Sequence, residues 1–317
     1  MLDDSSTSQS WERQTIQTVL LEHLNEQRRA RRWGIFFKLV TLVIIIAFAC
    51  NLYFKDRSQA AVSTREHTAV VNIYGAIAAD EEANAETIRD ALRSAFQNKQ
   101  AKGVVLRINS PGGSPVQARQ VYNEIRALRK QYPNTKVYAA IEDMGTSAAY
   151  LIACAADKIF ADETSLVGSI GVKMESFGFV DLMQKAGIER RAYTAGKYKT
   201  ILDPFAPMGE VEKQHILEEL KVTHDAFIQN VREGRGKRLQ ENELLFSGLF
   251  WSGSRALKLG LIDGFGDADF VAQTLVKAKE LVDYTPDINL IDKLTRRMGA
   301  SLGAALSGMH LLKQGLH

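Results

Sequence analysis

The chain has 317 residues, of which 45% are hydrophobic and 24% are charged, and its formal net charge is +3. This length allows one large domain or two small ones, and charges of both signs spread along the chain give no reason to expect a nucleic-acid partner. The two cysteines, Cys50 and Cys154, lie in a hydrophobic run and in an alanine-rich stretch, so no disulfide is expected, and Cys154 is expected to be a small buried residue. The six histidines show no metal-ligand spacing, and we expect neither a metal nor an organic cofactor.

A long apolar run follows a mostly polar N-terminal segment, residues 1–32. The run extends over residues 33–54, and four arginines lie between Arg28 and Arg32 immediately before it. About 20 apolar residues span a bilayer, and basic residues mark the cytoplasmic flank of such a segment. The pattern predicts a transmembrane anchor at 33–54, a cytoplasmic tail at 1–32, and a remainder that lies across the membrane.

Two other interpretations of this run compete with the anchor. Small residues at 47–50 resemble a signal-peptide cleavage site or a lipoprotein box, but the polar segment before the run is long for either. A buried core helix is disfavoured because residues 39–50 are apolar on nearly every face. The stretch 55–67 is polar and is interpreted as a linker.

Strand-like and helix-like segments alternate in the rest of the chain. This order predicts an α/β domain at 68–282 with a mainly parallel sheet and flanking helices, followed by an extension of unknown role at 283–317. Strands are expected at 69–74, 103–108, 136–141, 158–160 and 166–172, with an extended segment at 189–194, and helices at 88–96, 116–128, from about Thr146, and at 210–232. In such sheets the functional site lies at the carboxyl ends of the strands.

Two loops rich in small residues follow predicted strands. The first, residues 109–114, contains Gly112 and Gly113, which let backbone N–H groups face an anion such as a phosphate or an oxyanion. The second leads to Ser147, where a strand gives way to a helix, as in a nucleophile elbow without its second glycine. The alternatives are a plain tight turn for the first loop and a helix N-cap for Thr146 or Ser147.

A serine nucleophile needs a base, and the sequence offers two kinds. His67, His215 and His224 have no suggestive context, so a Ser-His-Asp triad lacks support. Lys199 lies in a Gly-Lys-Tyr-Lys-Thr segment that does not fit a P-loop. A free lysine has a pKa of about 10.4, so a lysine that acts as a base has to be kept dry enough to be neutral near pH 7.

At these residues the sequence resembles the signal peptide peptidase A (SppA) family of serine proteases, whose fold is of the ClpP/crotonase type. The resemblance covers roughly residues 68–280 and consists of five matching segments in the family's order. They are the loop at 108–113, the helix from Ser147 to 159, the segment 168–172, the lysine loop at 196–200 and the late motif at 260–263. The sequence departs from the family at Ala148 and Ala149, where the family usually has two glycines, and this change is expected to narrow the substrate groove.

The resemblance implies a role for each matched residue. Ser147 would be the nucleophile, Lys199 the general base and Ser169 the group that orients the lysine, while the N–H groups of Gly113 and Ala148 would form the oxyanion hole. The implied substrates are hydrophobic membrane-derived peptides, above all remnant signal peptides with small P1 and P3 residues. The implied location is a bacterial inner membrane with a periplasmic protease domain. Ring-like homo-oligomers are also implied, in which neighbouring subunits can complete the dyad.

Two rival functions remain from other classes. A crotonase-like enzyme would use paired N–H groups to hold a thioester enolate, but a domain outside the cytoplasm would have no access to coenzyme A. A catalytically inactive membrane-anchored scaffold is the other rival, and the presence of Ser147, Ser169 and Lys199 together argues against it.

Overall fold

The computed structural model of the chain describes residues 29, 31–47 and 65–286. The chain divides into two units, Met1–Val62 and Ser63–His317. In the first unit, residues 31–47 form a helix whose apolar side chains are exposed. Within the described ranges, no helix has the length and apolar character needed to cross a membrane. The predicted anchor continues to residue 54, so its last part lies outside the described residues. The predicted tail up to residue 28, most of the predicted linker and Cys50 also lie outside them.

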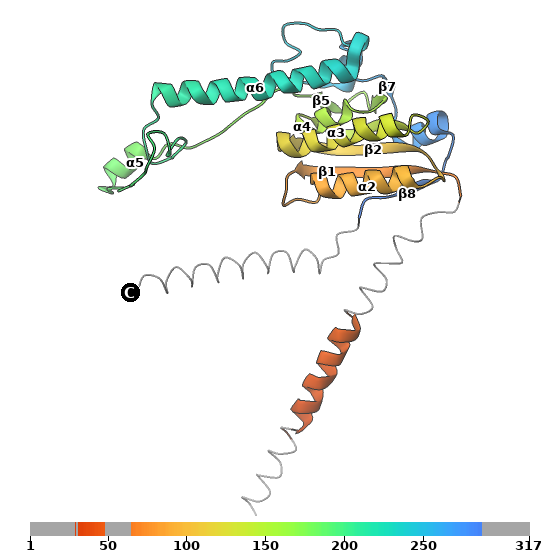
Figure 1. Cartoon of the computed structure of the whole chain (residues 1–317), viewed down its shortest axis with the longest axis horizontal. Helices are drawn as coiled ribbons and strands as arrows, with labels where there is room; N and C mark the ends of the chain where they lie inside the picture. Colours follow the sequence, from red (N-terminus) through yellow and green to blue (C-terminus); the bar gives the residue numbers. More distant parts are fainter. Residues whose placement is uncertain (1–28, 30, 48–64, 287–317) are drawn as a thin grey trace, which may run out of the picture. The chain divides into compact units, whose positions relative to one another are not determined.

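An eight-stranded sheet forms the centre of the second unit (Figure 1). Its path runs β6-β5-β3-β2-β1-β8, with β4 pairing with both β3 and β7. Every pair is parallel except β5 with β6, so the predicted mainly parallel sheet is confirmed. The strands are β1 (His67–Ile77), β2 (Ala101–Gly113), β3 (Lys136–Thr146), β4 (Lys158–Ala161), β5 (Leu166–Gly168), β6 (Phe250–Ser252), β7 (Gly264–Phe265) and β8 (Leu281–Asp283).

Helices cover the sheet, as the alternating pattern predicts. They are α2 (Ala85–Gln97), α3 (Pro115–Gln131), α4 (Ala148–Ala153), α5 (Val180–Lys185), α6 (Glu210–Arg235), α7 (Gly253–Lys258) and α8 (Ala268–Phe270), with a 3-10 turn at Gly236–Arg238 and a π-helical turn at Val271–Val276. Consecutive residues of β2 such as Val104 and Val105 are both fully buried, because both faces of a parallel sheet are covered. Val105 packs with Ala268 and Val271 in one buried cluster.

The structure differs from the predicted elements in three places. The strand expected at 166–172 ends at Gly168, because Gly168 and Ser169 both have positive φ (99° and 51°) and turn the chain. Residues 189–194 form no strand and lie in an exposed loop. The fold also continues past residue 282, where the sequence analysis ended the domain: β8 pairs with β1, and the Tyr284 hydroxyl lies 2.8 Å from Nε2 of the buried His67.

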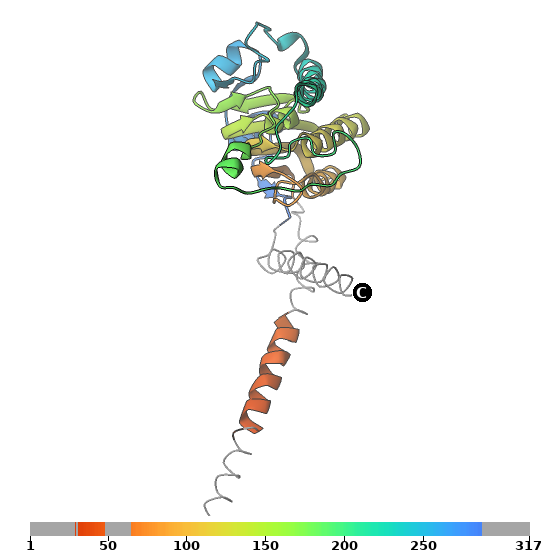
Figure 2. The same ribbon diagram turned by 90° about the vertical axis from the view of Figure 1, so that its left-hand side faces the viewer.

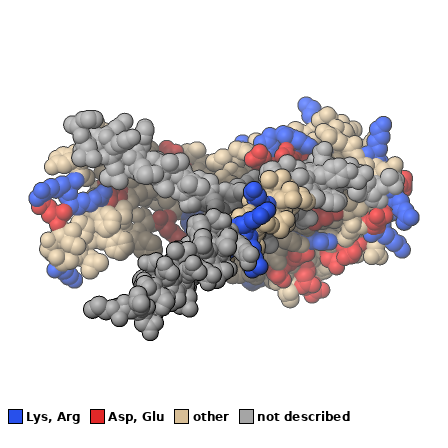
Figure 3. All heavy atoms as spheres, turned by 90° about the horizontal axis from the view of Figure 1, so that it is seen from below, with Lys and Arg blue, Asp and Glu red and all other residues tan. Residues whose placement is uncertain are grey.

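Helix α6 carries a projecting segment. Its buried residues all lie in its last third, from Phe227 to Arg235, although the helical apolar spacing in the sequence begins earlier, at Ile216. Residues 173–209, which we call the arm, run from the domain to α5 at the end of α6 that is remote from the sheet (Figure 1), and this end faces the viewer in Figure 2. Aromatic contacts hold the arm together, with the Phe179 ring 5.6 Å from that of Phe205. On the face shown in Figure 3, acidic and basic side chains are interspersed.

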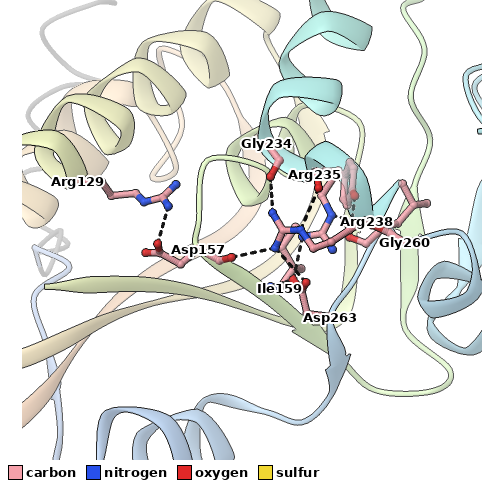
Figure 4. A network of polar contacts seen from close by, with 10 residues as sticks. Arg129, Asp157, Ile159, Gly234, Arg235, Arg238, Gly260 and Asp263 are labelled. Carbon is pink, nitrogen blue, oxygen red and sulfur yellow. Dashed lines mark hydrogen bonds and ion pairs between the residues drawn. The ribbon is translucent and has the colours of Figure 1, made fainter. Parts of the chain in front are cut away.

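A buried ionic network holds the other end of α6 on the domain (Figure 4). Arg235, 1% exposed, donates to the Gly260 carbonyl (2.7 Å) and to the Asp263 carboxylate (2.8 Å), and Arg238 donates to the second oxygen of that carboxylate (3.0 Å). Burial alone would raise the pKa of Asp263, but hydrogen bonding and charge from Arg235 hold it below the usual value. Asp157, bonded to Arg129, extends the network to α3.

Candidate active site

Ser147 lies at the carboxyl end of β3, immediately before α4. Its φ of 53° and ψ of −124° are unusual for a residue with a side chain, and such strain is typical of functional sites. The residue occupies the N-cap position of α4, but its side chain makes no capping hydrogen bond. The simple N-cap interpretation is therefore wrong, and the hydroxyl is left for another role.

The glycine loop lies directly against this serine. A Cβ atom added at Gly112, where φ is 100°, would lie 2.7 Å from the Cβ of Ser147 and 2.9 Å from the amide nitrogen of Ala148. The Thr146 hydroxyl donates to the Pro111 carbonyl (3.1 Å) and so links the two loops. The first N–H of a helix, here that of Ala148, has no acceptor within the helix. Ser147, Ala148 and Gly113 line one cavity.

Ser169 lies in the neighbouring turn and lines the same cavity. The N–H of Ser147 donates to the carbonyl of Gly168 (2.8 Å), which fixes this turn against the nucleophile turn. The Ser169 hydroxyl donates to the Gly248 carbonyl (3.2 Å), and its N–H donates to the Leu249 carbonyl (2.9 Å). Ser169 is therefore positioned beside Ser147 by backbone contacts to the segment before β6.

The cavity has a volume of about 660 Å³ and mixed walls. Its apolar lining includes Pro115, Leu151 and Phe227. His224 also lines it, with Nε2 3.0 Å from the Ile170 carbonyl, although the sequence analysis found no context that favoured this histidine. Its place in the cavity could have been inferred from its spacing, because His224 lies three residues before the buried Phe227 and a helix presents both on one face.

Lys199 lies apart from these residues within one chain. It is in the arm, its side chain is exposed, and it is not among the residues that line the Ser147 cavity. Nearby, Asp203 pairs with Arg190, and its pKa is lowered, mainly by that hydrogen bond. The structure thus brings Ser147, Ser169 and the two predicted N–H donors together, but not Lys199 of the same chain.

Two protein-family models match this chain. Residues 127–282 match peptidase family S49, and residues 56–166 match the Clp protease family. A protein of Methanocaldococcus jannaschii named "Putative protease MJ0651" is 34% identical over 218 residues, which are 69% of that protein and 66% of this chain. The chain belongs to peptidase family S49. The predicted resemblance to SppA proteases and the ClpP-like α/β fold are thereby confirmed.

Other matches cover less of their proteins. A protein of Enterococcus faecium named "Putative signal peptide peptidase SppA" is 30% identical over 205 residues, 65% of this chain and 59% of that protein. Two Brucella proteins named Na(+)/H(+) antiporter NhaA, from Brucella melitensis and Brucella abortus, are 42% identical over 245 residues, 74% of this chain. The chain spans only about a third (33%) of their length, so the antiporter name describes those longer proteins.

Cys154 is a further nucleophilic side chain, at the end of the helix that Ser147 begins. It lies just after α4 and is 1% exposed, as predicted for a small buried residue. Burial raises the pKa of its thiol to about 12, so the thiol stays protonated at neutral pH. Ser147 is therefore the better placed nucleophile.

Proposed function

We propose that the chain is a serine endopeptidase whose nucleophile is Ser147. The observation that carries the proposal is the position of this serine: a strained turn at the start of α4, with an uncapped hydroxyl and a glycine loop pressed against it at a cavity. Turns of this kind expose a nucleophile beside backbone N–H groups that can stabilise negative charge.

The reaction follows from these groups. The Ser147 hydroxyl oxygen bonds to the carbonyl carbon of a peptide and gives its proton to a general base, while the carbonyl oxygen becomes an oxyanion held by the N–H groups of Gly113 and Ala148. The intermediate collapses, the C–N bond breaks, and the base returns the proton to the leaving amine. Water then hydrolyses the acyl-serine ester and regenerates the hydroxyl.

The base in this proposal is Lys199 of a neighbouring subunit. Lys199 is exposed on the projecting arm and does not line the cavity of its own chain, so it is poorly placed to act as a base there. Burial of the arm against a second copy would exclude water from the arm and bring the amine to the second copy's Ser147 and Ser169. A homo-oligomer with shared dyads is therefore the proposed active form.

The proposed location is a bacterial inner membrane. In support, four arginines precede the apolar run at 33–54, which would place the N-terminus in the cytoplasm and the protease domain in the periplasm. The proposed substrates are hydrophobic peptides released in that membrane, remnant signal peptides among them. Apolar cavity walls such as Leu151 and Phe227, and the relative named SppA, support this substrate class.

Hydrolysis of a fluorogenic peptide with a small P1 residue tests the proposal. Ser147→Ala and Lys199→Ala should each abolish turnover, whereas Lys197→Ala, a matched loss of an exposed arm lysine, should retain it. Near wild-type turnover by either of the first two variants would overturn the dyad. Labelling of Ser147 by a fluorophosphonate separates a protease from an inactive scaffold or a crotonase-like thioester enzyme.

A further inference from the structure

Among the described residues, the cavity beside Ser147 is lined by basic side chains without acidic ones. Its ionisable lining residues are Arg119, Lys173 and His224, and among the residues that the structure describes no aspartate or glutamate lines it. The protein surface in Figure 3, by contrast, mixes acidic and basic groups. Positive potential in a concave site with low-dielectric walls is concentrated, so this cavity favours an anionic group.

Arg119 is the cavity cation with no partner of its own. It lies on α3 and is exposed, and within the described part of the chain it makes neither an ion pair nor a hydrogen bond. Lys173 differs, because it pairs with Glu175 at 2.8 Å. A guanidinium presents two parallel N–H groups that match the two oxygens of a carboxylate.

Asn230 provides a second, independent indication of a ligand. It is only 6% exposed and lines the same cavity from α6. Its backbone carbonyl accepts from the Tyr122 hydroxyl (3.4 Å), but its side-chain amide has no hydrogen-bond partner within the described residues. Neither polar atom of this amide is among the buried unpaired atoms of the described residues, so both are open to the cavity and available to a group that enters it.

We propose that Arg119 and Asn230 form a carboxylate-binding subsite of the Ser147 cavity. The preferred substrates would then carry a carboxylate a few residues from the cleaved bond, either a free C-terminus or an acidic side chain. A free C-terminus is what any earlier peptide hydrolysis leaves, so the first source would place this enzyme after another peptidase. The subsite rests on the proposed peptidase function, because its ligand is a peptide.

Binding by the full-length Ser147→Ala chain in detergent tests the subsite without turnover. The probes are three dye-labelled alanine–leucine peptides: one with a C-terminal carboxylate, one with a C-terminal amide, and one amide with an internal glutamate. We expect one carboxylate peptide to bind roughly tenfold more tightly than the neutral amide, with a preference that weakens as salt is added. Tighter binding of the peptide with the C-terminal carboxylate would identify a free C-terminus as the ligand, and tighter binding of the glutamate peptide would identify an acidic side chain.

Added variants connect the preference to the two residues. Arg119→Gln should bring the ratio of affinities close to one, and Asn230→Ala should lower it. Arg126→Gln is the matched control, because Arg126 is exposed on the same helix but lines a different hollow, and it should keep the full ratio. Equal binding of all three peptides, or a preference that survives Arg119→Gln, would overturn the subsite. Failure of the wild-type chain to hydrolyse any peptide would instead count against the proposed function.

Discussion

The backbone N–H of Ser147 donates a 2.8 Å hydrogen bond to the carbonyl of Gly168, so the turn before α4 and the turn after β5 form one hydrogen-bonded unit. Both turns contain a serine with positive φ, 53° at Ser147 and 51° at Ser169. Such conformations persist only where the surroundings enforce them. The unit holds both hydroxyls at the cavity before any substrate arrives.

Gly112 is predicted to be indispensable for this arrangement. A residue with a side chain would have to adopt the φ of 100° found there, and its Cβ would lie 2.7 Å from that of Ser147. Gly112→Ala should therefore displace the nucleophile and lower kcat/KM at least about 100-fold. Gly178→Ala is the control, because no atom lies within 4 Å of a Cβ added there. Peptide hydrolysis and circular dichroism of both variants check this; full activity of Gly112→Ala would contradict the close approach.

The dependence of peptidase activity on pH distinguishes a lysine base from a histidine base. If a lysine is the base, activity should rise from neutral into alkaline pH as the amine loses its proton. His224→Gln tests the alternative, since this imidazole lies in the cavity. We expect it to change kcat/KM by less than about tenfold and to leave the alkaline rise intact. Loss of all activity in His224→Gln, with a wild-type plateau already reached near pH 7, would make the histidine the base.

Removal of the Asp263 carboxylate should destabilise the domain. Asp263→Asn leaves Arg235 buried without its counter-charge, which typically costs about 3–5 kcal/mol. Urea unfolding at pH 7 measures the loss, and Asp269→Asn, a change of an exposed aspartate, serves as the control. Equal stability of both variants would show that the network contributes nothing.

The ion pair between Asp263 and Arg235 should also make the stability of the domain depend on pH. Because the folded-state pKa of Asp263 is below its usual value, its contribution to stability is present above the unfolded pKa of about 3.9 and is lost as the pH falls through the folded pKa. The difference in unfolding free energy between the wild type and Asp263→Asn should therefore shrink below about pH 4. A constant difference from pH 7 to pH 2 would contradict the lowered pKa.

Cys154 is predicted to be inert in the folded protein. Its thiol is buried, and its pKa of about 12 leaves almost no thiolate at pH 8. In a Cys50→Ser background, iodoacetamide should label Cys154 only after unfolding in urea, and mass spectrometry of the intact chain reads this out. Rapid labelling of the folded chain would show that the alanine-rich segment opens.

The sequence predicted the sheet and the place of the candidate site at the ends of its strands, because both depend on local patterns. Buried strands appear in the sequence as apolar runs, and the loops around Gly112 and Ser147 directly follow such runs. The outward course of the arm was not predicted, because the apolar spacing of α6 continues into the half of the helix that the domain leaves uncovered. Arg119 and Asn230 were also missed, since α3 and α6 bring them to Ser147 only through tertiary packing.

Mixing two inactive variants tests the central claim most directly. Ser147→Ala chains retain Lys199, and Lys199→Ala chains retain Ser147, so co-assembled chains can rebuild a dyad only between subunits. We predict that mixed assemblies recover up to about a quarter of wild-type peptidase activity, since random pairing joins one intact serine to one intact lysine at that fraction of contacts. If mixed assemblies form but hydrolyse no more peptide than either variant alone, the shared dyad is contradicted.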